Sequence, residues 1–392
     1  MNNNSWLLPD GVDEVLPPSA ARLESLRREI LDCFSRWGYE LVIPPVIEFL
    51  DALLSSEDDL DLQTLKVVDQ VSGKMMGVRA DITPQVARID AHRLHTDKPQ
   101  RLCYLGPVVH ATPDKFAGSR NPLQIGAELY GHDGIESDAE IACLMAEVLE
   151  LAALSPLTLE LGHMGVFKAL IESANLGREQ ENQILEILLR KAENELAKLL
   201  ASLGVANETQ ELFIALTQLA GGVEILPEIG RTFQNAAPAV KHALDDFSAL
   251  VDMLKQRIPG VNLYLDLAEL RGYHYHTGVT FAAYTGNIGR AVAWGGRYDN
   301  IGREFGRARP ATGFSADLKT LIGISPKTLD SVSSIFAPAG SEKSLLDAIT
   351  ELRQDGQIVI QALPGQLANA SEMGCSSELV YQDGQWQCRP CK

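Results

Sequence analysis

The stretch Leu270-Arg-Gly-Tyr-His-Tyr-His-Thr-Gly-Val-Thr-Phe-Ala-Ala-Tyr284 shows most clearly how this chain is built. Its fifteen residues hold one arginine, two glycines, three tyrosines and two histidines. A strand that only builds a core carries aliphatic residues on its buried face, whereas this one would carry hydrogen-bonding groups on both faces. We therefore predict a strand that lines a pocket for a small polar ligand.

The composition is that of a globular protein with more than one domain. At 392 residues and 45% hydrophobic, the chain can bury a sizeable core and is expected to form two or three domains. No run of eighteen apolar residues occurs, and residues 1–10 have neither basic side chains nor a long apolar stretch. We therefore expect no membrane span, no export signal and a cytoplasmic location.

The charge balance argues against a protein that binds nucleic acid. Acidic residues number 52 against 34 basic ones, which gives a formal net charge of -18. Binding to a nucleic acid relies on Lys and Arg side chains that neutralise its phosphates. The negative electrostatic field of this chain would instead repel the nucleic acid. We expect neither DNA nor RNA among its partners.

Two patterns suggest metal ligands, and both are incomplete. Cys388-Arg-Pro-Cys391 has the spacing of a zinc knuckle, but only Cys375 lies near it in the sequence, and a structural zinc site needs four protein ligands. His274 and His276 are spaced to share one face of a strand, yet no acidic or cysteine partner has metal-ligand spacing. We predict no metal and no cofactor. The remaining cysteines lie in apolar contexts and are expected to be buried free thiols: Cys33, Cys103 and Cys143.

Residues 1–164 have the pattern of a sheet with helices packed against it. Ser19 is placed to cap a helix that Gly38 ends. Thr83-Pro84 begins another helix, and Ser137 with Glu140 has the spacing of a capping box ahead of a third. Short apolar runs predict the strands and one hairpin of this part: residues 39–43, 67–78, 101–109 and 122–131.

The rest of the chain divides into three further parts. Leucines at three- and four-residue spacing predict an all-helical insertion over residues 165–258. Strand patterns return over residues 259–325, and residues 335–392 predict a strand, a helix and a strand. The predicted class is α+β: an antiparallel sheet flanked by helices, with a helical insertion and a small α/β C-terminal tail.

Six segments form one ordered series of motifs within residues 8–322. They are Leu8-Pro-Asp-Gly-Val-Asp-Glu-Val-Leu-Pro17, the helix from Ser19 with the strand that ends at Pro44-Pro45, Val78-Arg-Ala-Asp-Ile-Thr-Pro-Gln-Val-Ala-Arg88, Leu123-Gln-Ile-Gly-Ala-Glu-Leu-Tyr-Gly131, Arg271-Gly-Tyr-His-Tyr-His-Thr-Gly278 and Gly295-Gly-Arg-Tyr-Asp299. Together they resemble the catalytic core of histidyl-tRNA synthetases, which have the class II aminoacyl-tRNA synthetase fold. The resemblance implies that fold for this chain.

The departures from the synthetase pattern concern ATP. In a synthetase, one arginine of the second motif and another at the end of the third hold the ATP phosphates. Here His110 and Thr112 stand where the second motif has its arginine and its acidic partner. Asp317, Lys319 and Thr320 stand over the usual Gly, Glu and Arg of the third motif. An aspartate there would repel a nucleotide, so we expect ATP activation to be lost.

The positions that bind the amino acid match the synthetases more closely. The resemblance implies a histidine pocket of seven residues: Asp81, Thr83, Gln124, Glu128, Arg271, Tyr275 and His276. Carboxylates suit an ammonium group and an imidazole N–H, an amide suits a polar edge, and Arg271 is placed for the ligand's carboxylate. Tyr275 and His276 stand where the synthetase has two tyrosines. We predict no catalytic residue.

A synthetase-like core that keeps its amino-acid pocket, loses its ATP contacts and lacks a full anticodon-binding domain resembles one paralogous family. This is the family of regulatory subunits of ATP phosphoribosyltransferase. The resemblance implies a non-catalytic subunit that accompanies a short catalytic subunit in the first step of L-histidine biosynthesis. It also implies activation of that partner, feedback regulation by histidine, and a homodimer within a hetero-oligomer.

Alternatives remain at two levels. An unusual histidyl-tRNA synthetase that activates histidine with ATP fits part of the pattern, and so does a free-standing amino-acid-binding or transfer protein. At the level of residues, Asp81 and Thr83 can simply cap a helix, and Gln124 and Glu128 can be solvated on an edge strand. The sequence leaves open whether histidine binds in the synthetase-like pocket or between subunits.

Overall fold

The computed structural model describes residues 6–53, 60–112, 119–273, 275–286, 288–303, 305–328, 334–366 and 369–391. The chain forms two compact units, Met1–Pro326 and Lys327–Lys392, which are described separately. His274, one of the two histidines considered as metal ligands, lies outside the described residues.

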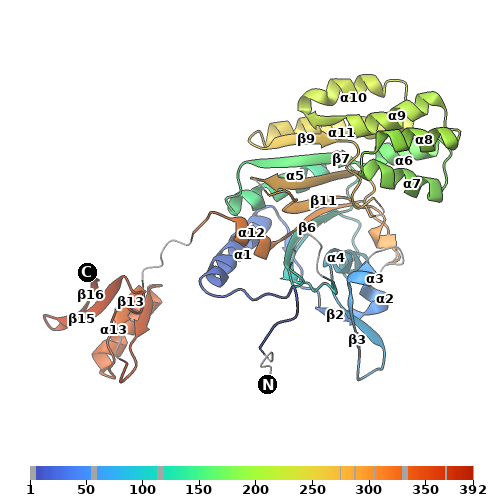
Figure 1. The fold of residues 1–392 in the computed structure, drawn as a ribbon. Helices are drawn as coiled ribbons and strands as arrows, with labels where there is room; N and C mark the ends of the chain where they lie inside the picture. Colours follow the sequence, from blue (N-terminus) through green and yellow to red (C-terminus); the bar gives the residue numbers. More distant parts are fainter. Residues whose placement is uncertain are drawn as a thin grey trace. The chain divides into compact units, whose positions relative to one another are not determined.

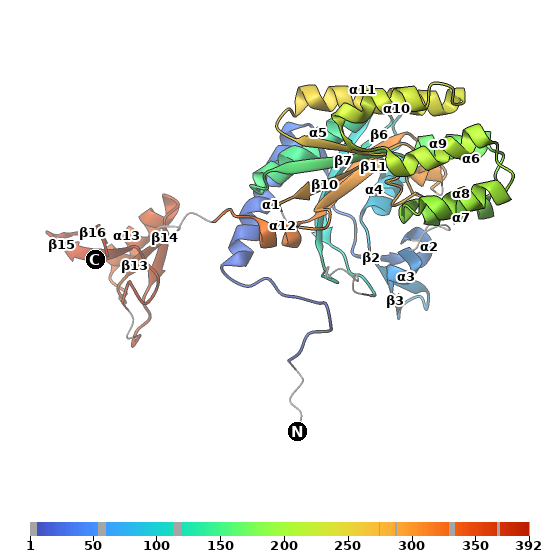
Figure 2. The ribbon, with the colours of Figure 1, turned by 45° about the horizontal axis from the view of Figure 1, so that its top comes forward.

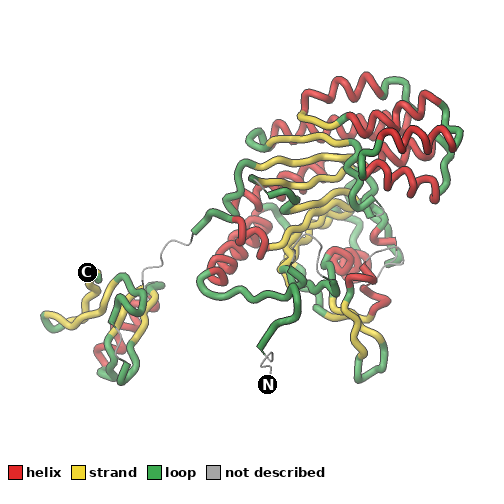
Figure 3. Tube along the Cα trace, in the orientation of Figure 1, coloured by secondary structure: helices red, strands yellow, loops and turns green. Residues whose placement is uncertain are grey.

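A nine-stranded sheet forms the body of the first unit (Figures 1 and 3). In spatial order its strands are β1 (Glu40–Leu41), β5 (Gln100–Pro107), β6 (Leu123–Tyr130), β12 (Ala311–Asp317), β11 (Ala293–Arg297), β10 (Val279–Thr285), β7 (Leu157–His163), β9 (Asn262–Asp266) and β8 (Ala220–Gly222). Neighbouring strands are antiparallel except β1 with β5 and β7 with β9. The α+β class is confirmed, with a mixed rather than a purely antiparallel sheet.

Strand alternation gives this sheet one apolar and one polar face. In β6, Ile125, Ala127 and Leu129 belong to the main hydrophobic core. Gln124 and Glu128 alternate with them and therefore lie on the opposite face. Glu128 pairs with Gly313 of β12, so the polar face continues across the neighbouring strand.

Helices cover the apolar face. The helices α1 (Ser19–Arg36), α5 (Ile135–Leu151) and α12 (Leu318–Ile324) contact one another or the strands β6 and β12. Figure 2 shows α1 and α12 side by side next to the sheet. Leu26, Ile30 and Cys33 recur at three- and four-residue spacing in α1, and this spacing turns all of them toward the core.

The chain between β7 and β9 is mostly helical. It contains α6 (Met164–Ser173), α7 (Arg178–Leu189), α8 (Glu193–Ser202), α9 (Asn207–Gln218), the 3-10 turn η2 (Val223–Ile225), α10 (Leu226–Thr232) and α11 (Pro238–Arg257). The prediction of an all-helical insertion is wrong at β8, which pairs with β9 at the sheet edge. The glycines of β8 are poor helix formers, and their backbone groups find partners on the open edge of β9 instead.

A smaller layer lies on the polar face of the large sheet. It contains a three-stranded sheet and short helices: β2 (Ile47–Phe49), β4 (Met75–Val78), β3 (Leu65–Val68), α2 (Leu50–Leu53), α3 (Leu60–Gln63), α4 (Thr83–Ile89), the π-helical turn η1 (Asp90–Leu94) and the 3-10 turn η3 (Ile301–Arg303). Val86 of α4 packs against Leu102, Tyr104 and Tyr130 of the large sheet in a second hydrophobic cluster. This cluster fixes α4 over β5 and β6.

The second unit is a four-stranded sheet with one helix. Its elements are β14 (Ile358–Gln361), β13 (Ser334–Ala337), β15 (Ser377–Gln382) and β16 (Gln385–Pro390), in spatial order, and α13 (Lys343–Gln354). It contains the expected strand, helix and strand, and adds the hairpin β15–β16. The sequence carried a signal for this hairpin, because Asp383-Gly384 adopts positive φ angles of 52° and 81°, which Asp-Gly favours in tight turns.

Three local predictions are wrong. The strand β10 begins at Val279, so Leu270–Gly278 is a loop rather than the first half of a strand. Gly272, with φ at 73°, takes a left-handed backbone conformation that a strand cannot include. The helix α1 begins at Ser19 itself, whose side chain caps nothing. Ser137 and Glu140 form no capping box, since Gly134 is the residue before α5 and Glu140 binds Arg101 and Tyr39.

Three further observations concern the described residues. None of their helices is long and apolar enough to cross a membrane. None of their His, Cys, Asp and Glu side chains cluster in threes suited to a metal ion. Cys33, Cys103 and Cys143 are buried free thiols, as predicted.

Candidate functional site

A cavity of about 800 Å³ lies on the polar face of the large sheet. Six of the seven predicted pocket residues line it: Asp81, Thr83, Glu128, Arg271, Tyr275 and His276. Gln124 lines an adjoining cavity of about 270 Å³, whose wall also includes Asp81. Pockets for small molecules have volumes of roughly 300–1,000 Å³, so the larger cavity can enclose an amino acid.

Asp81 and Gln124 form one hydrogen-bonded unit between the two cavities. Gln124 Nε2 donates to Asp81 Oδ1 at 2.7 Å, and the backbone N–H of Ile82 donates to Gln124 Oε1 at 2.9 Å. Asp81 Oδ1 also accepts the backbone N–H of Thr83, the first residue of α4, at 3.0 Å. Asp81 therefore stabilises the start of α4 while one edge of its carboxylate remains at the cavity.

Glu128 is buried at the floor of the larger cavity, with 1% of its surface exposed. The hydroxyl of Tyr298 donates to its Oε2, whereas Oε1 has no hydrogen-bond partner within the described part of the chain. Burial raises the pKa of Glu128 to about 8. A Cβ atom at Gly313 would overlap this carboxylate, so the glycine makes room for it.

A hydroxyl pair lies beside the Glu128 carboxylate. Thr83 Oγ1 and the hydroxyl of Tyr104 are 3.1 Å apart, and both residues are buried. The Tyr104 hydroxyl occupies space that a side chain at Gly126 would fill. Thr83 thus belongs to the cavity wall as well as to the first turn of α4.

Aromatic rings of the 270–278 loop form another wall. The rings of Tyr275 and Tyr298 stack with centroids 5.0 Å apart, and His276 meets Tyr275 edge-on at 5.1 Å. Nδ1 of His276 is 3.3 Å from the carbonyl oxygen of Arg297. Burial lowers the pKa of His276 to about 4, so its ring is neutral at pH 7. A neutral ring that donates through Nδ1 leaves Nε2 as an acceptor.

Arg271 lies at the open end of the cavity and is held by two glutamates. Its Nε and Nη2 donate to the two carboxylate oxygens of Glu269 at 2.7 and 2.8 Å. Nη2 also donates to the hydroxyl of Tyr284 at 2.9 Å and reaches Glu160 at 3.3 Å. Arg271 therefore lines the cavity as predicted, with two acidic partners that the sequence did not indicate.

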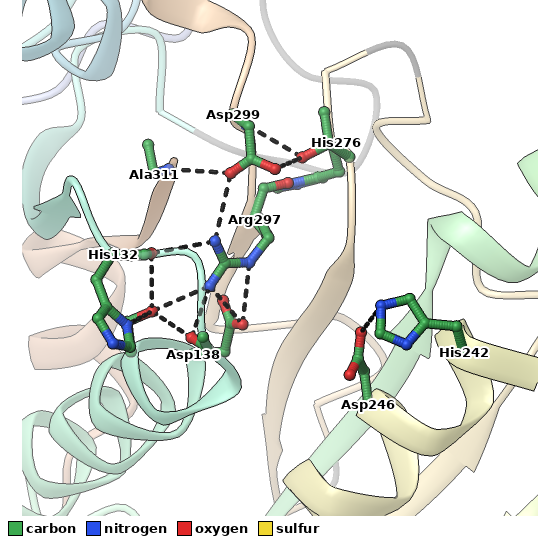
Figure 4. Close-up of polar contacts among 11 residues, drawn as sticks. His132, Asp138, His242, Asp246, His276, Arg297, Asp299 and Ala311 are labelled. Carbon is green, nitrogen blue, oxygen red and sulfur yellow. Dashed lines mark hydrogen bonds and ion pairs between the residues drawn. The ribbon is translucent and has the colours of Figure 1, made fainter. Parts of the chain in front are cut away.

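Arg297 anchors the loop from the apolar side of the sheet. Figure 4 shows it between Asp138 and Asp299, bonded to Asp138 at 2.8 and 3.0 Å and to Asp299 at 3.4 Å. Asp299 in turn accepts the hydroxyl of Thr277 at 3.0 Å. The ion pair of Arg297 and Asp138 is buried, and through Thr277 it fixes the end of the cavity loop.

The smaller cavity is lined by the residues that replace the synthetase arginines. His110 donates through Nε2 to the carbonyl oxygen of Ala80 at 3.1 Å, next to Asp81 in the chain. Asp317 accepts the backbone N–H groups of Lys319 and Thr320, each at 3.1 Å, at the start of α12. Both arginine replacements therefore have structural partners: His110 supports a loop, and Thr320 bonds to Asp317, the residue that caps α12.

The structure adds four residues to the predicted site: Tyr104, Tyr298, Glu160 and Glu269. Tyr298 stood within the quoted Gly295–Asp299 motif, so a signal for it was available. Strand pairing brings Glu160 to the cavity, opposite Ala282. It also places Tyr104, opposite Gly126, where its hydroxyl contacts Thr83 in the cavity wall. Such pairings cannot be read from one strand alone.

Comparisons with known proteins agree on the family. A family model described as histidyl-tRNA synthetase matches residues 11–321, and one described as ATP phosphoribosyltransferase subunit HisZ C-terminal domain matches residues 332–389. The ATP phosphoribosyltransferase regulatory subunit of Thioalkalivibrio sulfidiphilus (strain HL-EbGR7) is 51% identical over 381 residues, which cover 97% of this chain and 96% of the relative. The one from Pseudomonas aeruginosa (strain LESB58) is 52% identical over 389 residues and 98% of both chains.

Solved structures show the same fold. A crystal structure of an ATP phosphoribosyltransferase regulatory subunit/histidyl-tRNA synthetase from Bacillus halodurans C has a TM-score of 0.82 at 24% identity and covers 94% of this chain and 95% of its own. Histidyl-tRNA synthetase from Nostoc sp. PCC 7120 has a TM-score of 0.80 at 19% identity, and the match covers 96% of this chain and 91% of the synthetase chain. The predicted resemblance is confirmed, and with relatives at half identity over nearly its whole length the chain belongs to the family of ATP phosphoribosyltransferase regulatory subunits.

Proposed function

We propose that this chain senses L-histidine for an ATP phosphoribosyltransferase, and that histidine binds in the cavity above Glu128. The Oε1 atom of Glu128 carries the proposal, because a buried carboxyl oxygen with no hydrogen-bond partner among the described residues is unfavourable until a ligand bonds to it. An imidazole N–H or an ammonium group supplies such a donor with a charge-assisted hydrogen bond.

The other groups of the cavity suit the remaining parts of histidine. The Asp81 carboxylate and Thr83 lie on the side of α4, where they can hold an ammonium group. Arg271 lies at the open end and can meet the ligand's carboxylate. The rings of Tyr275 and His276 can pack against an imidazole.

The ligand is sensed and not activated. Adenylate formation needs cationic groups on the phosphates of ATP, and the two positions for them hold His110 and Thr320. His110 is bonded to a backbone carbonyl, and the Thr320 hydroxyl donates to Asp317 at 2.7 Å. We therefore expect no histidine-dependent pyrophosphate exchange at high protein concentration, whereas a histidyl-tRNA synthetase would show it.

The partner of this chain is a short catalytic subunit. The relatives are named as regulatory subunits, and a chain of the ATP phosphoribosyl transferase (HisG:HisZ) complex from Thermotoga maritima has the same fold at a TM-score of 0.58 and 17% identity. Feedback requires histidine to bind two states of the assembly with different affinity. We propose a homodimer of this chain within that hetero-oligomer, with histidine as the effector.

Calorimetry of the purified full chain with L-histidine tests the binding site. We expect one site per chain, and a loss of affinity of at least about tenfold in Glu128→Gln, the amount expected when a hydrogen bond to a charged group is weakened. His242→Asn is the matched control, since His242 is exposed and only reaches Asp246 at 3.7 Å. Equal affinity in wild type and Glu128→Gln would place histidine elsewhere.

A further inference from the structure

The contacts of Arg271 have a consequence for ligand choice. Besides the edge formed by Nη1 and Nη2, a guanidinium has an edge formed by Nε and one terminal nitrogen, which also binds a carboxylate through two parallel hydrogen bonds. In Arg271 both atoms of that edge already donate to Glu269, at 2.7 and 2.8 Å. The second hydrogen of Nη2 faces the Tyr284 hydroxyl at 2.9 Å.

Only Nη1 of Arg271 has no hydrogen-bond acceptor within the described residues. A ligand carboxylate can therefore bond to Nη1 alone unless Glu269 leaves the edge of Nε and Nη2 or the Tyr284 hydroxyl leaves the second hydrogen of Nη2. Glu269 is also well placed to stay, since its side chain is 17% exposed and its Oε1 accepts the backbone N–H of Arg271 as well, at 3.2 Å.

The charges around this end of the cavity add to the effect. Glu160 on β7 accepts the Tyr284 hydroxyl at 2.9 Å and lies 3.3 Å from Arg271 Nη2. Two carboxylates thus surround one guanidinium, and a third negative group must compete with both. The Arg271 side chain is 63% exposed, so solvent weakens its ion pairs. The competition should therefore change the affinity for the ligand only severalfold.

We propose that Glu269 sets the ligand specificity and the affinity threshold of the site by competing with the ligand's carboxylate for Arg271. The inference rests on the proposed histidine site. A feedback sensor must stay empty until its ligand accumulates, and an arginine already bound to Glu269 weakens the binding of free histidine. Glu269 is here a positioning residue, because it acts on the ligand through Arg271.

The experiment is calorimetry of the full chain with two probes, L-histidine and L-histidinol, which has a hydroxymethyl group in place of the carboxylate. In Glu269→Gln we expect the ratio of histidine affinity to histidinol affinity to rise about fivefold, the amount expected for one partly exposed ion pair. Glu269→Asp keeps the charge but is too short for the two parallel bonds, and should raise the ratio as well.

Glu186→Gln is the matched control. Glu186 is exposed on α7, the helix whose Leu185 and Leu189 line the same cavity, and it should leave the ratio unchanged. The inference is overturned, and the histidine site kept, if the affinity ratio rises equally in this control. The same holds if the ratio rises in neither Glu269 variant. No binding of either probe to wild type or variants overturns the histidine site itself, and the inference with it.

Discussion

Glu128 is the residue on which the account of the pocket depends, and its protonation offers a direct test. With a pKa near 8, Glu128 is mostly protonated at pH 7 in the free protein. A bound cation or N–H donor favours the carboxylate and lowers this pKa, so histidine binding at pH 7 should release up to about one proton per site. The apparent binding enthalpy should then differ between phosphate and Tris buffers.

The sign of this linkage predicts its pH dependence. As the pH rises toward 9, Glu128 is already ionised in the free protein and has no proton to release. Release should therefore fall between pH 7 and 9, and it should be absent in Glu128→Gln at every pH where that variant still binds. Identical enthalpies in both buffers at pH 7 would mean that Glu128 does not change its protonation state.

Gly313 gives a second test at this scale. Gly313→Ala would place a methyl group on the Glu128 carboxylate, so we expect loss of histidine binding and a decrease of about 1–3 kcal/mol in the free energy of unfolding, as overpacked cores show. Gly323→Ala on α12 is the control, because no atom lies within 4 Å of the added group. In a helix it should be neutral or stabilising by up to about 1 kcal/mol. Denaturant unfolding measures the stability of both variants. A Gly313→Ala variant with normal stability and normal histidine binding would refute the close packing of Gly313 against Glu128.

Residue types in motifs predicted most of the residues that line the cavity, but the hydrogen-bond partners of those residues did not follow from the motifs. Asp81, Thr83 and Glu128 were found because their motifs bring them together in one fold. The pairing of Arg271 with Glu160 depends on the register of β10 with β7. No pattern within either strand contains that register, so the contact of Arg271 with Glu160 could not be predicted. Glu269, the other acidic partner, stands two residues from Arg271 in the sequence.

At the scale of elements, the cavity loop shows where strand prediction fails. Tyrosines and threonines favour strands, and they misled the prediction over residues 270–278. Gly272 prevents a strand there, and the backbone N–H of Thr277 bonds to the carbonyl of Arg297 at 2.7 Å instead. By contrast, β5 and β6 were predicted correctly, because an unbroken run of apolar residues at alternate positions leaves few other solutions.

The Arg297–Asp138 pair, which joins β11 to α5, gives a prediction about stability. Arg297→Met leaves the Asp138 carboxylate buried without its partner, and we expect a loss of about 3–5 kcal/mol in the free energy of unfolding at pH 7.5. Arg190→Met is the control. It is the same substitution at a residue whose ion pair with Glu195 is exposed. Chemical denaturation measures both.

The loss in Arg297→Met should depend on pH. Burial already raises the pKa of Asp138 to about 6 despite the arginine, and removal of the arginine raises it further. A carboxyl pKa that is raised on folding destabilises the fold increasingly as the pH rises from the unfolded pKa to the folded pKa, and at lower pH protonation removes the buried charge. The difference between variant and wild type should shrink from pH 7.5 to pH 5. A difference that is constant with pH would show that packing, and not charge, is at stake.

At the scale of the whole molecule, four exposed apolar residues near the start of the chain are candidates for the contact of the proposed homodimer. Leu41, Ile43, Ile47 and Phe49 are 49%, 82%, 48% and 43% exposed, and a partner surface would remove such apolar side chains from water. We expect a dimer in analytical ultracentrifugation and a shift toward monomer in Ile43→Glu. Val71→Glu, at a residue 96% exposed on the β3–β4 turn, should stay dimeric. A monomeric wild type would refute the dimer.

We propose that the histidine sensitivity of the catalytic partner comes from this chain. The most direct measurement is the rate of ATP phosphoribosyltransferase activity of the short catalytic subunit, alone and with this chain, as histidine is added. We predict a faster rate with this chain, inhibition by histidine only in the complex, and relief of that inhibition in Glu128→Gln. A catalytic subunit that is fully active and fully inhibited by histidine on its own would contradict the account.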